Sequence, residues 1–350
     1  MKNATLLIVS VIVGLYLLDL AARHTLNPSS IYSSFNTLPE LNQWHNEVEF
    51  WERYEDQPEK ANFASYDPVL GWEPEASRDG IRGAIRIAPE SAQGVTRIVA
   101  VGDSFVYGTD VEADENFSAL LDARLPQTEV LNMGVPGYGI DQAYLKYRHL
   151  GAAYNPQVIV FGIYVSDYER SSMTFTTFAK PKFAERENGF VVVNQPVPEP
   201  LAELSRISRA LEGRSYLVDA LRNGWRKLTT GAAEQKAFFD GTDRIVTHIL
   251  EALKDGLAQD QQLLIVHIPR GETFIEQEPF RDEMSRRLLA IYDALQLNTI
   301  DLSAEFISGS TPAEIYQTHY FHRPNGSVGH LSPVGHQKVA DLITARLRLE

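Results

Sequence analysis

The sequence predicts a three-layer α/β fold, with a central parallel sheet between two layers of helices, preceded by one N-terminal transmembrane helix. From residue 96 onward, short apolar runs alternate with stretches of helical periodicity, the order that builds a parallel sheet covered on both faces. The run at 157–165 (QVIVFGIYV) is apolar throughout, as strands buried on both faces are. A separate apolar run stands at the N-terminus and is long enough to cross a bilayer.

The strands and helices follow one another in a regular order. Strands are expected at 97–103, 129–135, 157–165, 263–268 and 298–302, and helices at 115–125, 140–154, 243–258, 281–295 and 332–350. Ser332 is the expected N-cap of the last helix, with Pro333 at its first position. An insertion at about 171–240 interrupts this order. It contains a hairpin turning at Asn188–Gly189 and two helices.

Three domains or segments are therefore expected. Residues 1–23 form a membrane anchor or a signal, and 96–350 form the α/β domain with its insertion. Residues 24–95 hold a polar linker, an amphipathic helix and an irregular lead-in. The helix is predicted by apolar residues at steps of three and four: Leu38, Leu41, Trp44, Val48, Trp51 and Tyr54. Packing on the main domain is its simplest role; lipid contact and self-association remain open.

The N-terminal run Ala4–Ala22 carries one charge, Asp19, and approaches the ~20 residues that a spanning helix needs. Lys2 precedes it and Arg23 follows, which mildly favours an N-terminus inside. A cleaved signal peptide is the rival interpretation, but the run is long for one and lacks an A-x-A site. We therefore expect a single-pass protein of the inner membrane with an extracytoplasmic domain. Secretion after signal cleavage is the alternative.

Composition excludes several classes of function. The net charge of −14 argues against nucleic acid as a partner, because phosphate binding needs a basic face. The absence of cysteine excludes disulfides, thiolate metal sites and cysteine nucleophiles. No group of His, Asp and Glu has metal-ligand spacing, so we expect neither a metal nor a cofactor.

Four polar, glycine-rich segments stand where the expected strands end or the last helix begins. They are GDSFVYG at 102–108, NMGVPGYG at 132–139, YVSDY at 164–168 and GHLSPVGH at 329–336. In an open parallel sheet, function gathers at the carboxyl ends of the strands. Ser104 sits in a glycine-flanked turn that exposes its hydroxyl, and Gly134 and Gly137 allow a second loop to approach. His330 could accept the Ser104 proton, while backbone N–H groups stabilise an oxyanion.

In this order the segments resemble the blocks of the SGNH/GDSL hydrolase superfamily, whose fold is flavodoxin-like. GDSFVYG resembles the nucleophile block, NMGVPGYGIDQ the glycine block and GHLSPVGH the histidine block, with YVSDY at the place of the Asn block. The lead-in YDPVLGW…GIRG and the NGFVVVNQPVP hairpin resemble a membrane-anchored bacterial subgroup associated with cell-surface polysaccharide modification. The resemblance covers about 66–348 and implies Ser104 as nucleophile and His330 as base. It implies oxyanion donors at Ser104, Gly134 and position 166.

Two positions depart from the family pattern. Ser166 replaces the family's Asn, and its hydroxyl is a shorter, freely rotating donor. The family's Asp is expected two or three residues before the histidine, where this chain has Val328 and Ser327. We therefore expect a Ser–His dyad whose imidazole is oriented by a backbone carbonyl, Asn325 or Ser327.

Two aspartates complete the candidate site. Asp103 is expected to brace the serine turn, and Asp167 to cap a strand end or to act as a displaced acid. The resulting hypothesis is a serine esterase or O-acyltransferase acting on acyl esters, acetyl above all, of cell-surface or secreted glycan. A catalytically impaired glycan-binding or scaffold protein of envelope polysaccharide assembly is the alternative.

Overall fold

The computed structural model describes residues 2–25, 28–32, 39–62, 65–75, 77–83, 88, 93–277, 279–324 and 328–347. The chain divides into two compact units. Unit 1 comprises residues 1–63, 173–179 and 198–238, and unit 2 comprises 64–172, 180–197 and 239–350. The segments at 173–179 and 198–238 thus fold with the N-terminal part of the chain rather than with the sheet.

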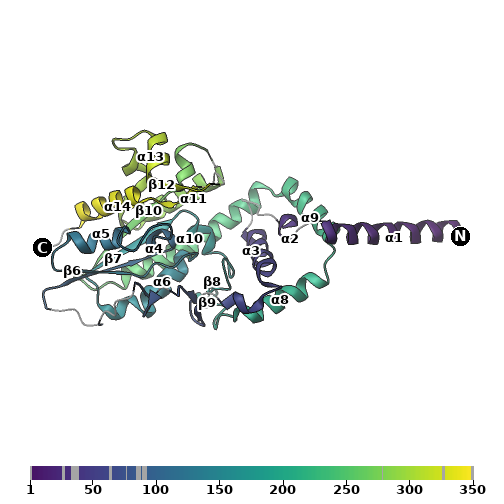
Figure 1. The fold of residues 1–350 in the computed structure, drawn as a ribbon, viewed down its shortest axis with the longest axis horizontal. Helices are drawn as coiled ribbons and strands as arrows, with labels where there is room; N and C mark the ends of the chain where they lie inside the picture. Colours follow the sequence, from purple (N-terminus) through teal and green to yellow (C-terminus); the bar gives the residue numbers. More distant parts are fainter. Residues whose placement is uncertain are drawn as a thin grey trace. The chain divides into compact units, whose positions relative to one another are not determined.

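A five-stranded parallel sheet forms the centre of unit 2 (Figure 1). Its strands are β5 (Thr96–Val101), β6 (Thr128–Asn132), β7 (Val158–Tyr164), β10 (Gln262–Ile268) and β11 (Asn298–Asp301). They lie in the order β11-β10-β7-β5-β6, with every neighbouring pair parallel. The chain leaves β5 toward β6 and then crosses to β7 on the other side, so the order reverses at β5. Ligand sites of doubly wound sheets lie at such a reversal, beside the carboxyl ends of the strands.

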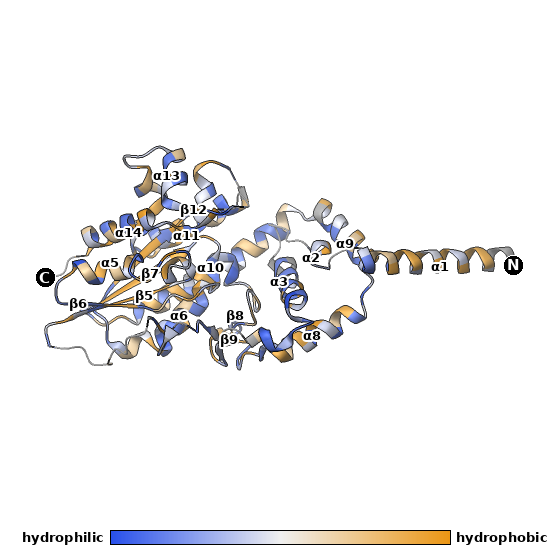
Figure 2. Cartoon of the chain, viewed as in Figure 1, coloured by the Kyte–Doolittle hydropathy of each residue, from blue (hydrophilic) through white to orange (hydrophobic). Residues whose placement is uncertain are grey.

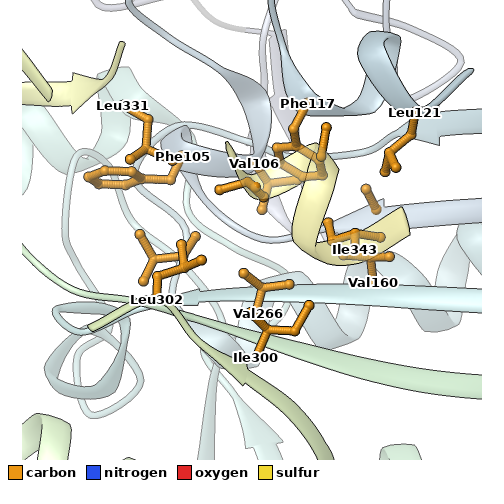
Figure 3. Close-up of a cluster of buried hydrophobic side chains, with 14 of the residues drawn as sticks. Phe105, Val106, Phe117, Leu121, Val160, Val266, Ile300, Leu302, Leu331 and Ile343 are labelled. Atoms are coloured by element: carbon orange, nitrogen blue, oxygen red, sulfur yellow. The ribbon is translucent and has the colours of Figure 1, made fainter. Parts of the chain in front are cut away.

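Helices cover both faces of this sheet. The helices of unit 2 are α4 (Ser104–Tyr107), α5 (Phe117–Arg124), α6 (Ile140–His149), α7 (Asp167–Arg170), the larger part of α10 (Ala232–Asp255), α11 (Pro279–Ala294), α12 (Leu302–Ile307), α13 (Pro312–His319) and α14 (Pro333–Arg346), with the 3-10 helices η2 (Gly151–Tyr154) and η3 (Gly271–Phe274). On one face, α5 and α14 pack on side chains from four strands (Figures 1 and 3). On the other, α11 packs on β10, where the Tyr292 and His267 rings lie 5.9 Å apart. The expected three-layer fold is confirmed.

The core between the sheet and α5, α12 and α14 is apolar and closely filled (Figure 3). Val160 and Val266 point from the sheet toward Phe117 and Ile343 of the covering helices, and all four are at most 2% exposed. Phe105 and Val106, directly after Ser104, belong to the same cluster. Burying such side chains contributes about 1.5–3 kcal/mol each, so the serine turn is anchored to the core on its C-terminal side.

Among the described residues of unit 2, four antiparallel strand pairs lie outside the sheet. They are β1 (Ser65–Asp67) with β2 (Gly71–Glu73), β3 (Ser77–Arg78) with β4 (Ile81–Arg82), β8 (Lys182–Arg186) with β9 (Gly189–Val193), and β12 (Tyr320–His322) with β13 (Val328–Leu331). The hairpin expected near Asn188–Gly189 is present as β8–β9. Because Arg186 pairs with Gly189, its two-residue turn is Glu187–Asn188, one position earlier than expected.

Unit 1 is helical. Its elements are α1 (Lys2–Thr25), α2 (Pro28–Ile31), α3 (Pro39–Tyr54), η1 (Pro58–Asn62), α8 (Pro200–Glu212), α9 (Tyr216–Thr229) and the beginning of α10 (Ala232–Asp255). The expected amphipathic helix is α3, which contacts α2 and α8. Phe50 of α3 also lies 5.5 Å from Phe175, ring centroid to ring centroid. Its apolar side therefore packs within unit 1.

Helix α1 is almost wholly exposed and apolar (Figure 2). Residues Thr5–Thr25 are the one helical stretch, within the described part of the chain, that is long and apolar enough to span a membrane. At 1.5 Å per residue this stretch is about 31 Å long, close to the thickness of a bilayer's hydrocarbon core.

Candidate active site

Ser104 lies at the first turn after β5, at the position where the strand order reverses. Asp103 is the N-cap of α4, and its Oδ1 accepts a hydrogen bond from the Phe105 N–H at 2.9 Å. Gly108 ends α4 in the left-handed conformation, with φ of 79°. The turn is thus braced at both ends, and Asp103 has the bracing position that the sequence suggested. Ser104 itself is 7% exposed.

His330 reaches Ser104 from the far end of the chain. It belongs to β13, and Ser332 two residues later is the N-cap of α14. The Nε2 atom of His330 lies 2.8 Å from the Ser104 Oγ. Its ring also contacts Phe105, at 4.9 Å between centroids. The structure therefore brings together the two residues expected as nucleophile and base.

Asp110 supplies the carboxylate that the sequence analysis did not find. Its Oδ2 lies 2.8 Å from His330 Nδ1 and accepts the His330 backbone N–H at 3.1 Å. The expectation of a dyad without an acid is corrected by this contact. The acid comes from the loop after the serine turn, six positions beyond Ser104, rather than from the residues before His330.

The pKa of Asp110 keeps this carboxyl ionised. Burial raises its pKa, but the hydrogen bonds from the His330 side chain and backbone and the Arg323 charge outweigh burial and hold it below the usual value. Arg323 Nη2 lies 3.2 Å from the same Oδ2. An ionised Asp110 fixes the proton of His330 on Nδ1, which leaves Nε2 free to accept the Ser104 proton.

Asp103 and Asp167 share one guanidinium beside the serine. Arg170 Nη1 lies 3.1 Å from Asp103 Oδ2 and 2.7 Å from Asp167 Oδ1. Burial, and then the nearby Asp103 charge, raise the pKa of Asp167 well above its usual value. The other Asp167 oxygen accepts the Tyr164 N–H at 3.0 Å. Asp167 is therefore a strand-end cap and not a carboxylate on His330.

The expected oxyanion donors have different surroundings. Gly134 lies against the serine turn, where an added Cβ would be 2.3 Å from the Tyr107 nitrogen, so a glycine is required for this approach. Its N–H, however, donates to Asn132 Oδ1 at 3.0 Å. Ser166 Oγ accepts a hydrogen bond from Arg281 Nη1 at 2.5 Å. Of the two backbone donors named from the sequence, the Gly134 N–H is engaged by Asn132, whereas no acceptor for the Ser104 N–H is found within the described part of the chain.

Two further C-terminal histidines, His336 and His322, have hydrogen-bond partners other than Ser104. His336 is fully buried in α14, and its Nδ1 accepts the Phe117 N–H at 3.4 Å. Burial, with the nearby Arg82 and His330 charges, lowers the pKa of His336 to about 3. His322 is exposed on β12, with Nε2 2.8 Å from the Tyr316 carbonyl oxygen. Both side chains therefore have structural surroundings.

Asn325 and Ser327, the side chains proposed from the sequence to orient His330, lie outside the described residues. Gly137 lies in the loop after β6 with φ of 85°, as a tight turn requires. Among the residues that the structure describes, no cluster of three His, Asp or Glu side chains is arranged to hold a metal ion.

Comparison with known proteins found matches among solved structures. No protein-family model and no curated protein matches the chain. A member of the lipolytic G-D-S-L family from Veillonella parvula is similar over 73% of this chain and 100% of its own, at 12% identity and a TM-score of 0.42. The acetylxylan esterase Axe2 from Geobacillus stearothermophilus is similar over 74% of this chain and 98% of its own, at 14% identity and a TM-score of 0.41.

Sequence reasoning missed Asp110 for a definable reason. It placed the acid where the superfamily has it, close to His330 in the chain. The segment after the serine turn (TDVEADEN, 109–116) holds several acids, and nothing in its pattern distinguishes Asp110 from Glu112 or Asp114. One signal could have indicated Asp110. A histidine base normally has a carboxylate partner, so when the segment before His330 holds none, the acid is expected in another loop at the same edge of the sheet.

Proposed function

We propose that the chain is a serine esterase of the SGNH type whose catalytic residues are Ser104, His330 and Asp110. The observation that carries the proposal is the unbroken line of contacts from Asp110 Oδ2 to His330 Nδ1 and from His330 Nε2 to Ser104 Oγ, each 2.8 Å long. Nucleophile, base and orienting acid in hydrogen-bond reach of one another are the arrangement that nucleophilic acyl transfer needs.

The reaction follows from this geometry. Ser104 Oγ attacks the carbonyl carbon of an ester while its proton passes to His330 Nε2, and Asp110 stabilises the imidazolium. The tetrahedral intermediate collapses, and His330 protonates the departing alcohol oxygen. Water, or a sugar hydroxyl in the case of transfer, then gives its proton to His330 and attacks the acyl–Ser104 ester. As the second tetrahedral intermediate collapses, His330 returns this proton to Ser104 Oγ, which releases the acid or the new ester and regenerates both residues.

The oxyanion site is the weaker part of this machinery. The Ser104 N–H is placed to donate to the developing oxyanion, whereas the Gly134 N–H is engaged by Asn132. Ser166 accepts from Arg281, which leaves its hydroxyl hydrogen to donate. Loss of one such donor commonly costs about 10²–10³ in turnover, so we expect a slow enzyme unless substrate binding releases the Gly134 N–H.

The proposed substrate is an acyl ester, acetyl above all, of cell-surface or secreted glycan. Resemblance of the lead-in and hairpin to the membrane-anchored subgroup supports this class. The net charge of −14 makes nucleic acid an unsuitable partner. Water and sugar hydroxyls are both competent acceptors at an acyl–serine ester, so deacetylation and transfer are two outcomes of one mechanism.

We further propose that α1 is a retained anchor that holds the domain on the extracytoplasmic side of the inner membrane. Contacts between α1 and the rest of unit 1 support retention over cleavage. Asp19 Oδ1 accepts hydrogen bonds from Ser215 Oγ at 2.7 Å and from the Leu217 N–H at 3.1 Å. Arg23 lies over the Tyr216 ring, 4.8 Å from its centroid. A cleaved segment would remove these contacts from the mature protein.

The test of catalysis is labelling of the purified full chain with a fluorophosphonate probe, together with acetate release from a panel of acetylated sugars and polysaccharides. Labelling at Ser104 and acetate release are expected, and both should vanish in Ser104→Ala. A protein that takes up no label and releases no acetate across the panel would contradict the esterase proposal.

The second candidate is an impaired member that binds glycan without turnover. The engaged Gly134 N–H and the serine at position 166 favour it. It predicts that glycan affinity survives Ser104→Ala and that Ser166→Asn restores nothing. For the esterase, Ser166→Asn should raise the rate if the oxyanion donor is limiting.

A further inference from the structure

Helix α9 carries an exposed apolar stripe along its whole length. Its members are Val218, Leu221, Trp225 and Leu228, with 48%, 67%, 68% and 83% of their surface exposed. Steps of three, four and three place them on one side of a helix with 3.6 residues per turn. Four large apolar side chains in a row are unusual on a surface that faces only water.

The opposite side of α9 is turned into unit 1. Asp219 Oδ2 accepts the Tyr32 hydroxyl at 2.5 Å, and Asn223 Nδ2 donates to the Ile31 carbonyl oxygen at 3.1 Å. Both side chains are buried. These contacts fix the rotation of the helix about its axis, so the apolar stripe faces outward.

The start of α9 is joined to the end of the apolar helix α1 (Figures 1 and 2). Asp19 and Arg23 are the charged residues there, and a charge is costly inside hydrocarbon, so at this end of α1 the bilayer is expected to thin and the charged side chains to extend toward the lipid head groups. Ser215 and Leu217 are hydrogen-bonded to Asp19. Hence α9 begins at the head-group level.

We propose that α9 lies along the bilayer surface with its apolar stripe among the head groups and the upper acyl chains. This inference rests on the proposal that α1 is a retained anchor. Lipid covers the whole stripe only if α9 runs along the bilayer surface. If α9 pointed away from the bilayer, only Val218, at its start, would be immersed. Trp225 in the stripe is the residue type enriched at membrane interfaces.

Two arginines border one side of the stripe. Arg222 and Arg226 each follow a stripe residue by one position and border a cavity of about 510 Å³ in unit 1. Positive side chains at this border can reach lipid phosphates while their alkyl parts stay against the apolar surface. The anchor would then hold unit 1 by two elements, α1 through the membrane and α9 on it.

The test uses single-cysteine variants, because the chain contains no cysteine of its own. The full chain with Leu221→Cys or Leu228→Cys is labelled with the fluorophore NBD and reconstituted in vesicles of phosphatidylcholine and phosphatidylglycerol. The matched control is Leu201→Cys, an exposed leucine in the first turn of α8. Quenching by doxyl-labelled lipids then reports direct contact with acyl chains. Circular dichroism and probe labelling check that each variant is folded.

Both stripe labels should emit at shorter wavelength and lose about half of their emission to doxyl lipids, as expected for side chains immersed ~5–10 Å into the interface. The Leu201→Cys label should stay water-like and unquenched. A water-like label at position 228 would overturn the proposal, as would a shielded label that doxyl lipids do not quench, since a protein surface would then cover the stripe.

The inference and the proposals it depends on fail separately. Recovery of a chain that begins near residue 23 would show that α1 is cleaved and would contradict the anchor proposal, whatever the position of α9. If the full-length chain is in the membrane but the label at position 228 is not quenched, only the α9 proposal is contradicted. Esterase activity is measured independently by labelling of Ser104.

Discussion

At the scale of single residues, the contact of Asp110 with His330 distinguishes a Ser–His–Asp triad from a Ser–His dyad. A buried or half-buried imidazolium next to Ser104 is stabilised only if a negative charge lies on its Nδ1 side. The Asp110 side chain is 26% exposed and that of His330 18%, so water screens this pair only in part. Arg323 on the same Oδ2 keeps the carboxyl ionised and in place.

Replacement of Asp110 by asparagine tests this role directly. Asp110→Asn should lower kcat/KM for Ser104-dependent ester hydrolysis by about 10⁴, because an amide can hold His330 in the wrong tautomer and cannot stabilise its positive charge. Steady-state hydrolysis of an activated acetyl ester measures the loss. Asp114→Asn, an exposed aspartate of the same loop, is the matched control and should be silent. Equal rates in Asp110→Asn and the unmodified chain would contradict the triad.

At the scale of elements, β13 positions His330 and also leaves room for Asp110. Gly329, directly before the histidine, faces the acid: an added Cβ would lie 2.7 Å from Asp110 Oδ2 and 3.1 Å from Phe321 Cβ. Since Asp110 is held by its bonds to His330, the carboxyl can avoid such a Cβ only by giving up that contact.

Gly329→Ala should therefore impair catalysis while the fold remains. We expect kcat to fall by more than about tenfold, up to the ~10⁴-fold limit set by complete loss of the acid. Hydrolysis rates and a thermal unfolding curve separate the two effects. The control is Gly241→Ala in α10, where an added Cβ meets nothing within 4 Å. Full activity in Gly329→Ala would show that Asp110 can move without loss.

Helix α14 is held to α5 partly by a neutral histidine. The His336 ring lies 6.0 Å from the Phe117 ring and stacks on it, and no partner for Nε2 is found in the part of the chain that the structure describes. Its pKa of about 3 lies well below the usual value of about 6.5. Above pH ~6.5 the His336 side chain is neutral in both the folded and the unfolded state, so its contribution to stability is fully present. As the pH falls from ~6.5 toward 3, only the unfolded chain takes up the proton, so the folded state loses stability.

The unfolding free energy should fall with acid by up to about 1.4 kcal/mol per pH unit through His336. His336→Asn, which keeps a hydrogen-bond acceptor without titrating, should flatten this dependence in urea unfolding measured across the same window. His267, whose pKa burial lowers to about 4, contributes in the same direction, so a residual slope is expected. An unchanged slope in His336→Asn would contradict the assignment.

At the scale of the whole molecule, the chain combines an apolar N-terminal helix with a strongly acidic remainder. With a net charge of −14 the chain is repelled by anionic lipids unless a local feature holds it, and the apolar helix α1 and the apolar stripe of α9 are the features of unit 1 proposed here to do so.

The retained anchor predicts a definite behaviour in fractionation. The protein should stay with membranes after high-salt and carbonate washing, and its intact mass should include residues 1–25, because a ~31 Å apolar helix leaves the bilayer only in detergent. Protease added outside the inner membrane should digest the domain. A soluble product that begins near residue 23, or a domain protected from external protease, would contradict retention or orientation respectively.

Local pattern determined most of the architecture, because secondary structure depends on near neighbours. Strand runs such as 157–165 and the start of α14 at Ser332 are predictable from periodicity and capping alone. The placement of Ser104 at the carboxyl edge of the sheet also follows, since it stands directly after a parallel strand; His330 stands on β13, outside that sheet, so this argument does not place it. Only the tertiary structure decided that Asp110, 220 positions from His330, is its partner and that the Gly134 N–H is engaged by Asn132. It likewise decided that Asp19 meets Ser215. Such pairings depend on how loops of unrelated sequence are brought together in space, which no periodicity along the chain records.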